Sequence, residues 1–382
     1  MKRPLKIGIE VQRLFRKKKH GMEIVALEIL RELQQLDTYN QYVVFVRDGE
    51  DSECLKETPN FKIDVISSSS YPTWEQFALP KAAKKHGLDF LHSTCNTSAI
   101  RLPVPLMLTL HDIIYLEKVD FQGTAYQNFG NIYRRFVVPV VVKHSEYVIT
   151  VSNFEKGVIK NRLNVPDEKL KVIYNAVNKR FNNNFTEAEI ANFRKQYNLP
   201  EEFILFLGNT APKKNAPNTI AAYIKYCREV ENPMPMVILD YDRALLDQTL
   251  SAANASDLGK HFVSPGFIPS ANMPQMYNAA TLFLYPSLRE SFGLPILEAM
   301  GCNTPVITSN TSCMPEIAGD AAYLVDPFSV DEMTVAIKTL LADEAQMADL
   351  SAKGLVRAAQ FSWKAAAENL LSLYQQFPVK NS

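Results

Sequence analysis

The segment TLFLYPSLRESFGLPILEAM, Thr281 to Met300, combines a strand, a turn and the start of a helix in one run of sequence. Its first residues are apolar and aromatic, as in a strand buried within a parallel sheet. Gly293 permits a tight turn, and Pro295 is typical of the first turn of a helix, where its missing N–H needs no partner. A buried strand, a turn and a helix over about 294–300 form the repeating unit of an α/β fold.

Two carboxylates, Glu290 and Glu298, flank this turn. The amides of Phe292, Gly293 and Leu294 at the helix N-terminus would favour an anion such as phosphate. Carboxylates accept hydrogen bonds from hydroxyl groups instead, so a diphosphate between a sugar and a ribose would offer hydroxyls to both. The alternative is a solvated loop residue followed by an ordinary helix residue. Spacing by itself does not decide between these two interpretations.

The same alternation of strand and helix runs through most of the chain, and helical stretches such as residues 22–36 separate the apolar segments. The first half contains the segments KIGIEVQ, YVVFVR, FKIDVIS, DFLHS, PLMLTLH, YVITVS and KVIYNAV, and the second half contains FILFLG, PMVILD, HFVSPG, TLFLYPS, TPVITS and AAYLVDP. We therefore predict an α/β protein with two doubly wound, Rossmann-like sheets in tandem rather than one large sheet.

The polar segment NKRFNNNFT, residues 178–186, has little periodicity and is predicted to be a linker. It separates a first domain, residues 1–178, from a second domain, residues 179–363. Ligands of open parallel sheets bind at the carboxyl ends of strands, and two-domain proteins favour the cleft between their domains. Functional residues are therefore expected just after strands that face a common cleft.

Length and composition indicate an ordinary globular chain. Its 382 residues are 47% hydrophobic and 21% charged, which excludes a disordered, collagen-like or coiled-coil protein. Five cysteines without a CxxC pair or metal-ligand spacing favour a reducing compartment. The first residues resemble neither a signal peptide nor a membrane span, so we predict a cytoplasmic protein.

Charge is unevenly distributed along the chain. Residues 1–180 hold 27 Lys and Arg against 20 Asp and Glu, a net charge of +7, and the remainder carries −7 because the whole chain is neutral. The basic half is a candidate for contact with an anionic acceptor or a membrane surface. Its densest basic segment, RLFRKKKH at 13–20, is equally well explained as a solvated loop.

A resemblance to a known family covers nearly the whole chain. YPSLRESFGLPILEAM, followed by TPVITSNTSCMPEIAGDAAYLVDP, resembles the signature of family four retaining glycosyltransferases, which have the GT-B fold of two Rossmann-like domains. Further similar segments follow the family's order along the chain: TLHDIIYLE, ITVSNFEKGVI, KVIYNAV, FLGNTAPKKN, GFIPSANMPQMYNAATLFLYPS and FSWKAAAENLL. The ordered series is much more specific than the two glutamates alone.

The resemblance implies donor-binding roles around the opening segment. Glu290 matches the first glutamate of the family's E-x7-E motif, which holds hydroxyls of the transferred sugar, and Glu298 matches the second, a partner of the donor ribose. Ser291 belongs to the same donor-binding segment, and the amides of Phe292, Gly293 and Leu294 match those that meet sugar and phosphate oxygens.

The resemblance also assigns residues outside this segment. Lys214 matches the lysine that neutralises the donor diphosphate, whereas Asn209 stands where the family often has arginine. His111 matches a histidine near the reacting sugar, and Asp112 is expected to orient the loop. Gly21 is a partial match to a glycine-rich loop that lets backbone approach the donor phosphate.

Two further segments complete the resemblance. Asn303 replaces a common glycine in a tight turn. The final helix, about residues 364–382, resembles the one that crosses back to brace the first domain.

The implied activity is transfer of a hexose with retained configuration, without a cofactor or a metal. The donor is a nucleotide diphosphate sugar, with GDP-mannose favoured and glucose, galactose, N-acetylglucosamine and rhamnose left open. The acceptor is a saccharide or lipid-linked saccharide of polysaccharide, lipopolysaccharide or glycolipid synthesis, with peripheral contact to the inner face of a membrane. Acceptor residues are not identified, and nucleic acid is not an expected partner.

Three other functions remain open. A nucleotide-sugar epimerase or hydrolase can share the fold and would act without an acceptor. A catalytically inactive nucleotide-sugar-binding protein would bind without turnover. The sequence supports a dinucleotide dehydrogenase less well than these two functions, because GIEVQRLF at the first strand lacks the GxGxxG pattern.

Overall fold

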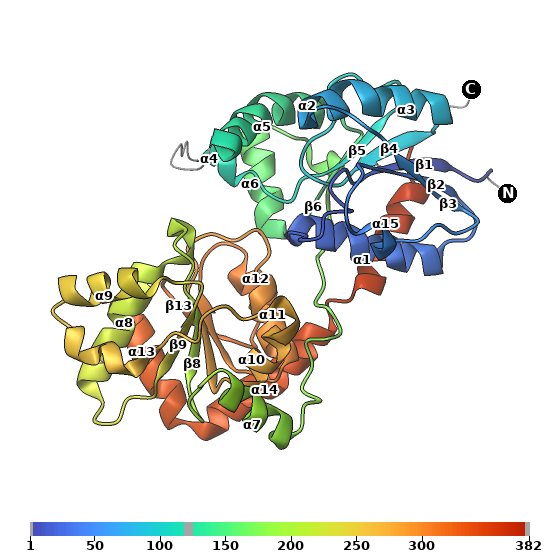
Figure 1. Cartoon of the computed structure of the whole chain (residues 1–382). Coiled ribbons are helices and arrows are strands. Elements are labelled where there is room, and N and C mark those ends of the chain that lie inside the picture. Colours follow the sequence, from blue (N-terminus) through green and yellow to red (C-terminus); the bar gives the residue numbers. More distant parts are fainter. Residues whose placement is uncertain (1–2, 118–124, 379–382) are drawn as a thin grey trace. The chain divides into compact units, whose positions relative to one another are not determined.

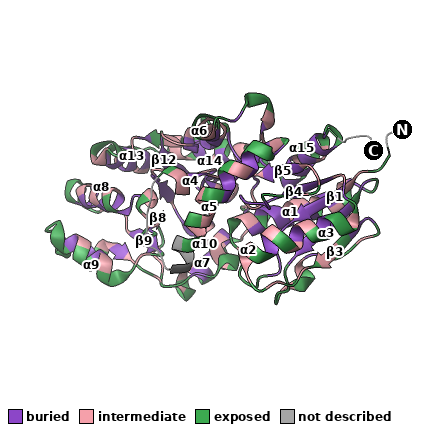
Figure 2. Cartoon of the chain, turned by 90° about the horizontal axis from the view of Figure 1, so that it is seen from above, coloured by how far each residue is buried: buried purple, intermediate pink, exposed green. Residues whose placement is uncertain are grey.

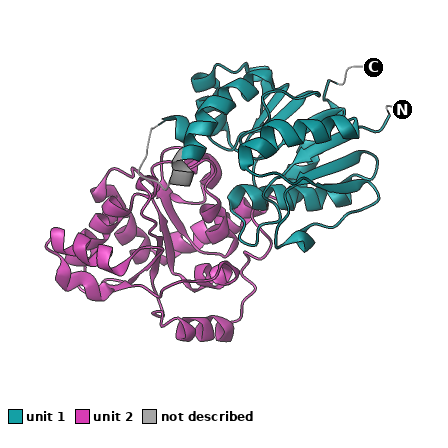
Figure 3. Ribbon diagram, turned by 45° about the horizontal axis from the view of Figure 1, so that its top comes forward, with its two compact units in different colours: residues 1–176, 363–382 teal, residues 177–362 magenta. Residues whose placement is uncertain are grey.

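The computed structural model describes residues 3–117 and 125–378, the side chains of 125–128 excepted. The chain divides into two compact units, Met1–Ala176 with Trp363–Ser382 and Val177–Ser362 (Figure 3). These divisions lie next to the domain boundaries expected from the sequence. Each unit is described by itself below.

Unit 1 contains a seven-stranded parallel sheet in the order β3-β2-β1-β4-β5-β6-β7 (Figure 1). Its strands are β1 (Lys6–Glu10), β2 (Gln41–Val46), β3 (Phe61–Val65), β4 (Phe90–Ser93), β5 (Leu106–Thr109), β6 (Tyr147–Thr150) and β7 (Leu170–Val172). Its helices are α1 (Gly21–Leu36), α2 (Tyr71–Thr73), α3 (Leu79–His86), α4 (Ile114–Glu117), α5 (Ala125–His144), α6 (Asn153–Leu163) and α15 (Trp363–Gln375), with the shorter η1 (Ser52–Cys54), η2 (Trp74–Ala78) and η3 (Asp167–Lys169).

The two faces of this sheet bury alternate residues of each strand. On β2, Val44 packs in one core cluster with α1 and α15, whereas Phe45 packs in another with α3. Helices α5 and α6 complete the second face with a cluster that includes Leu108 and Val148. Figure 2 shows central strands such as β4 as buried and the outer faces of helices such as α3 as exposed. Successive residues of a strand are thus buried under helices on opposite faces of the sheet. This is the doubly wound arrangement that the sequence predicts.

Unit 2 contains a six-stranded parallel sheet in the order β10-β9-β8-β11-β12-β13. Its strands are β8 (Ile204–Leu207), β9 (Met236–Leu239), β10 (Phe262–Val263), β11 (Leu282–Tyr285), β12 (Val306–Ser309) and β13 (Tyr323–Val325). Its helices are α7 (Glu187–Gln196), α8 (Ala216–Glu229), α9 (Arg243–Ala252), α10 (Met273–Ala279), α11 (Leu294–Gly301), α12 (Met314–Ala318), α13 (Val330–Ala342) and α14 (Glu344–Ala359), with η4 (Pro212–Lys214), η5 (Ser256–His261) and η6 (Ser270–Asn272). The expected fold class, with two Rossmann-like parallel sheets, is confirmed.

The final helix belongs to unit 1, as expected. Side chains of α15, including Leu370 and Tyr374, are buried in the core cluster that covers β1 and β2. Beyond the helix, Phe377 stacks on Phe90 of β4 with ring centroids 4.0 Å apart. The helix ends at Gln375 rather than at 382, and residues 379–382 lie outside the described part of the chain.

Each sheet has one point where the strand order reverses. In unit 1 the reversal lies between β1 and β4, and in unit 2 it lies between β8 and β11. Connections on the two sides of such a point leave in opposite directions, which opens a crevice at the carboxyl ends of the strands. Ligands are therefore expected at two places, after β1 and β4 and after β8 and β11.

Within the described residues, no helix has both the length and the apolar character needed to cross a membrane.

Candidate functional site

The turn after β11 prepares the N-terminus of α11 for an anion. Gly293 has φ +84°, a left-handed conformation that glycine adopts without strain, and it is the N-cap of α11. The Ile296 amide donates to the Gly293 carbonyl at 3.0 Å, and Pro295 has no N–H. The donors left for a ligand at this terminus are the amides of Gly293 and Leu294, at the positive end of the helix dipole.

The Phe292 ring anchors this turn in unit 2. The Phe292 side chain is 3% exposed and packs edge-on against Phe361, with centroids 5.8 Å apart. Ser291 is partly buried. Because its ring is used in packing, Phe292 could contact a ligand only through its backbone, as the sequence predicts.

Glu290 and Lys214 are brought together at the reversal point of the unit 2 sheet. Lys214 Nζ lies 2.7 Å from Glu290 Oε1 and donates to the Tyr285 hydroxyl at 2.6 Å. The Tyr285 hydroxyl in turn donates to Glu290 Oε1 at 3.1 Å. Lys214 ends η4 after β8, while Tyr285 ends β11. The sequence predicted both charged residues as functional but did not predict that they pair.

Burial and charge have opposite effects on Glu290. Desolvation would raise the pKa of its carboxyl group, but the ammonium groups of Lys214 and Lys213 and hydrogen bonds from Lys214 and Tyr285 hold that pKa below its usual value. Lys213 Nζ lies 3.6 Å from Glu290 Oε2. Sequence reasoning missed Lys213, although its position beside Lys214 was a signal. Glu290 is therefore an ionised acceptor with two cations beside it.

Hydrogen bonds from side chains to backbone hold the loops around this cluster together. Asn215 follows Lys214 with φ +61°, and its Nδ2 donates to the Pro286 and Pro327 carbonyls at 3.0 and 2.7 Å. The Ser312 Oγ accepts from the Glu290 amide at 3.1 Å and donates to the Glu290 carbonyl at 2.8 Å. Sequence reasoning missed Asn215 and Ser312, because only the folded chain brings these loops side by side.

Asn209 is exposed, and its side chain is used locally. Its Oδ1 accepts from the Ala211 amide at 2.8 Å, which closes the turn after β8. The residue supplies no positive charge where the family often has arginine.

Glu298 lies one turn inside α11 and is partly exposed. Desolvation raises the pKa of its carboxyl group to about 7, against the lowering effects of a hydrogen bond from Tyr277 and the charge of Arg180. The Tyr277 hydroxyl donates to Glu298 Oε2 at 3.1 Å. The carboxyl group can therefore change its protonation near neutral pH.

In unit 1, His111 follows β5 and is buried. Its Nε2 lies 2.9 Å from the Thr94 carbonyl, and its amide donates to Asn96 Oδ1 at 2.6 Å. A carbonyl can only accept, so the proton resides on Nε2 and Nδ1 is a potential acceptor. Desolvation lowers the pKa of His111, which keeps the ring neutral. Asp112 Oδ1 accepts from the Ile114 amide at 3.2 Å, the loop-orienting role expected for Asp112.

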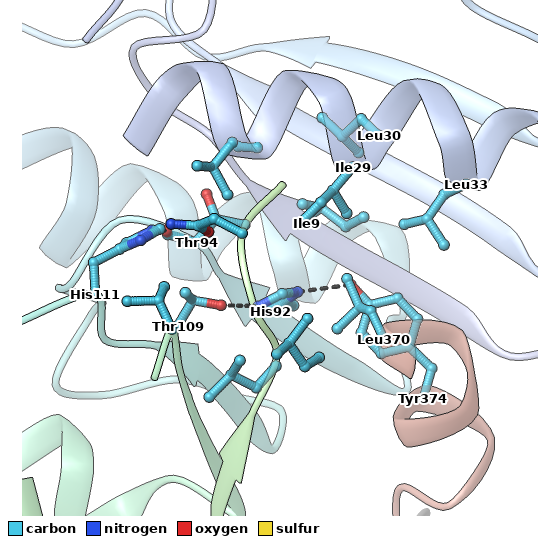
Figure 4. A pocket seen from close by; sticks show the side chains of 16 residues that line it. Ile9, Ile29, Leu30, Leu33, His92, Thr94, Thr109, His111, Leu370 and Tyr374 are labelled. Atoms are coloured by element: carbon cyan, nitrogen blue, oxygen red, sulfur yellow. Dashed lines mark hydrogen bonds between the residues drawn. The ribbon is translucent and has the colours of Figure 1, made fainter. Parts of the chain in front are cut away.

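His111 borders an apolar pocket whose inner wall includes His92 (Figure 4). His92 lies between Tyr374 of α15 and Thr109, at 2.6 and 2.8 Å, and burial lowers its pKa to about 3. The pocket holds only about 30 Å³, the share of one water molecule in the liquid. It is too small for a sugar, and it lies where α1 and α15 pack on the sheet.

Gly21 begins α1, as expected, and is exposed. A Cβ added there would meet no protein atom within 4 Å, and its φ is not in the left-handed region. The His20 amide donates to Glu23 Oε2 at 2.7 Å and completes the cap of the helix. Nothing in the described protein therefore requires glycine at this position.

Asn303 has φ +63°, so it takes the left-handed turn position where the family often has glycine.

No group of three or more His, Cys, Asp or Glu side chains in the described parts of the chain is arranged to hold a metal ion.

Comparison with known proteins identifies both halves of the chain. Residues 20–181 match the family model described as Glycosyltransferase Family 4, and residues 189–357 match the one described as Glycosyl transferases group 1. The O-antigen chain mannosyltransferase B of Escherichia coli is 30% identical over 235 residues, 60% of this chain and 61% of that protein. The serotype-specific mannosyltransferase WbdA of Escherichia coli is 28% identical over 274 residues, 71% of this chain and 33% of that protein. The matches thus span less than two thirds of the length of either relative.

Solved structures agree in fold. HepE from Anabaena, in complex with UDP and glucose, superposes with a TM-score of 0.72 at 17% identity, over 98% of this chain and 100% of that one. Because the two family models follow one another along the chain, this protein combines a domain of Glycosyltransferase Family 4 with a second domain of the Glycosyl transferases group 1.

Proposed function

We propose that the protein transfers a hexose, by preference mannose, from a nucleotide diphosphate sugar to a hydroxyl group of a saccharide or lipid-linked saccharide. Membership of the family supports glycosyl transfer, and the names of the two bacterial relatives favour mannose and a role in lipopolysaccharide synthesis. We further propose GDP-mannose as the donor and a cytoplasmic location, with peripheral contact to the membrane that carries a lipid-linked acceptor.

The observation that carries this proposal is the cluster of Lys214, Glu290 and Tyr285 beside the N-terminus of α11. It combines an ammonium group and helix amides, which suit a diphosphate, with an ionised carboxylate, which suits sugar hydroxyls. It also lies at the reversal point of a doubly wound sheet, the expected place for a nucleotide.

In the proposed reaction the bond between the anomeric carbon and the phosphate oxygen breaks, and a bond forms from that carbon to the acceptor oxygen on the same face. The acceptor proton passes to the departing phosphate, so the products are a glycoside and a nucleoside diphosphate. Lys214 and the amides of Gly293 and Leu294 stabilise the negative charge that grows on the leaving group. This positive charge takes the role that a metal ion would otherwise have.

The other proposed substrate contacts have narrower roles. Glu290 holds hydroxyls of the transferred sugar, and Glu298 holds hydroxyls of the ribose. His111 and Gly21 are proposed contacts of the sugar and the diphosphate, respectively.

A donor panel with product analysis tests this function. Thermal unfolding with GDP, UDP, ADP and dTDP and with their sugars should show stabilisation by one nucleotide family, GDP by preference. Incubation of that donor with saccharide acceptors should then give a glycoside whose anomeric configuration, measured by NMR, matches the donor. Free sugar or an isomer formed without an acceptor would favour the hydrolase or epimerase, and affinity without turnover would favour an inactive binding protein.

A further inference from the structure

Unit 1 contains a polar pocket at the carboxyl ends of β1 and β4, separate from the apolar pocket beside His111. Its volume is about 200 Å³, and its walls come from the end of β1 and the segment after it, the start of α1, α2, the segment after β4, and α5. At about 30 Å³ for each water molecule, this is room for six or seven waters or one sugar ring. The strand order of the unit 1 sheet reverses at this place, so the pocket occupies its expected ligand position.

Gln12, just beyond β1, provides a hydrogen-bond donor that the described protein does not use. The residue is 4% exposed and lines the pocket, yet its Nε2 has no hydrogen-bond partner among the described residues. A buried amide nitrogen without a partner destabilises the folded protein, because it has lost its hydrogen bond to water. A ligand hydroxyl in the pocket would accept from this group and remove that cost.

The Glu10 carboxyl group lines the pocket, and the buried Glu75 carboxyl group holds three hydroxyl-bearing residues of its walls. Glu10 Oε1 accepts from the Gln12 amide at 2.9 Å. Glu75 accepts from the hydroxyls of Tyr71, Thr97 and Tyr133 at 2.8, 2.5 and 2.6 Å. Desolvation and the neighbouring Glu75 raise the pKa of Glu10 to about 8. The Glu10 carboxyl group is therefore largely protonated at neutral pH and can both donate to and accept from a hydroxyl group.

Aromatic rings and a guanidinium group form the other walls. Tyr71 and Tyr133 meet edge to face with centroids 5.7 Å apart, and Phe129 of α5 lies beside Tyr133 with 53% of its surface exposed. The Arg13 guanidinium lies over the Tyr71 ring, 4.9 Å from its centroid. Hydrogen-bonding groups on one side and aromatic faces on another match the two faces of a sugar ring, one rich in hydroxyls and one in C–H groups.

We propose that this pocket binds one sugar ring of the acceptor glycan, with the Gln12 amide and the Glu10 carboxyl group hydrogen-bonded to its hydroxyls and Tyr133 and Phe129 against its apolar face. This inference rests on the proposed glycosyl transfer and gives it an acceptor site. A neutral polyhydroxyl ligand suits the pocket, because the Gln12 amide and the protonated Glu10 carboxyl group are uncharged hydrogen-bonding groups. Glu23 offsets part of the charge of Arg13 and Arg134 along the walls.

Gln12→Met is the most informative variant, because it keeps the length of the side chain and removes the amide group that carries the unused donor. A structural role for the Gln12 side chain would make this variant less stable, whereas a ligand-binding role predicts an unchanged or higher melting temperature. Glu53→Gln, an exposed position in η1, is the control for substitution in the same unit.

The experiment uses the full chain and three probes: methyl α-mannoside, methyl α-glucoside and methyl α-galactoside, titrated by saturation-transfer NMR. GDP-mannose is titrated in parallel to report on the donor. We expect one glycoside to bind the wild type and the Glu53→Gln protein alike, and to bind Gln12→Met at least about fivefold more weakly. Donor affinity and donor hydrolysis should be the same in all three proteins.

Equal glycoside affinity in wild type and Gln12→Met would overturn the inference, as would absence of binding of all three glycosides to the wild type. In either case, retained GDP-mannose binding would leave the proposed function standing. Loss of donor binding in the wild type would instead count against the proposed function itself.

Discussion

The Lys214 ammonium group contacts both a carboxylate and a phenol, those of Glu290 and Tyr285. The Glu290 contact is the shorter of two ion pairs that compensate a mostly buried carboxylate, and it holds the flexible lysine side chain in one place. A diphosphate brought next to this ammonium group would meet a cation that is already oriented. Such orientation before binding lowers the entropy cost of forming the complex.

Replacement of Lys214 by alanine should therefore reduce catalysis much more than folding. One preorganised donor to a developing anion is typically worth about 3 kcal/mol, so we expect kcat/KM to fall about 100-fold or more. Lys213 remains beside Glu290 and limits the loss of stability. Steady-state kinetics provide the measurement, with Lys338→Ala, an exposed lysine paired with Glu229, as the control. Wild-type kinetics for Lys214→Ala would contradict its assigned role.

Glu298 predicts a pH dependence of stability. Burial raises its folded-state pKa to about 7 from the ordinary 4.5, against the opposing effects of Tyr277 and Arg180. A carboxyl group with a raised folded-state pKa adds stability below the unfolded-state value, and that contribution is lost as the pH rises toward about 7. Between pH 4.5 and 7 the free energy of unfolding of unit 2 should fall by about 3 kcal/mol relative to Glu298→Gln. Urea unfolding of the two proteins across this pH range measures the difference. The same pH dependence of the free energy of unfolding in both proteins would show that the Glu298 side chain is not desolvated.

At the scale of single residues, the sequence predicted identities better than contacts. The spacing of Glu290 and Glu298 singled out these two residues, and the family resemblance gave them and Lys214 donor-binding roles, which stay predictions. Asn215 and His92 could not be predicted, because their partners Pro327 and Tyr374 lie far along the chain. Such contacts depend on how the loops and helices pack, and the local pattern does not record this.

The helix α11 and its turn show why strands and helices could be predicted here. Parallel strands buried on both faces give continuous apolar runs, and every predicted strand segment overlaps one strand of the structure, although β2 and β7 each begin one residue before their segments. Gly293 and Pro295 gave the start of α11 within one residue. The ends of helices were predicted less well, because they depend on local capping. α11 extends to Gly301, one residue beyond the predicted end at 300, and α15 ends at Gln375, before the predicted end at 382.

Two glycines at helix N-termini should respond differently to alanine. Gly293→Ala places a side chain at φ +84°, with its Cβ 3.3 Å from Ile296, and should cost about 1–2 kcal/mol. Gly21→Ala meets no protein atom and should leave stability unchanged or slightly higher. If backbone at Gly21 approaches the donor phosphate, Gly21→Ala should nevertheless raise KM for the donor. Thermal unfolding and donor kinetics of the two variants test this, and an unstable Gly21→Ala protein or an unchanged donor KM would contradict it.

At the scale of the whole molecule, the fold returns to its first unit at the end of the chain. α15 completes the unit 1 core, where Ala367, Leu370 and Tyr374 are buried against α1 and the sheet. The resemblance predicted this return, but composition and periodicity could not, because an amphipathic helix does not specify which sheet it covers.

Truncation after Ser362 should therefore destabilise a unit that lies mostly at the other end of the sequence. Loss of the buried apolar surface of α15 and of the His92–Tyr374 hydrogen bond should remove several kcal/mol from unit 1. Hydrogen exchange followed by mass spectrometry should show faster exchange in β1 to β7 and unchanged exchange in β8 to β13. Equal protection of unit 1 in both proteins would contradict the role given to α15.

The central claim is that the diphosphate of a nucleotide sugar binds at the reversal point of the unit 2 sheet. A crystal structure of the full chain with GDP-mannose, or with the donor that the panel selects, measures this directly. We predict phosphate oxygens within about 3 Å of Lys214 Nζ and of the Gly293 and Leu294 amides, with the sugar hydroxyls on Glu290. A diphosphate bound elsewhere, with Lys214 still contacting only Glu290 and Tyr285, would contradict the claim.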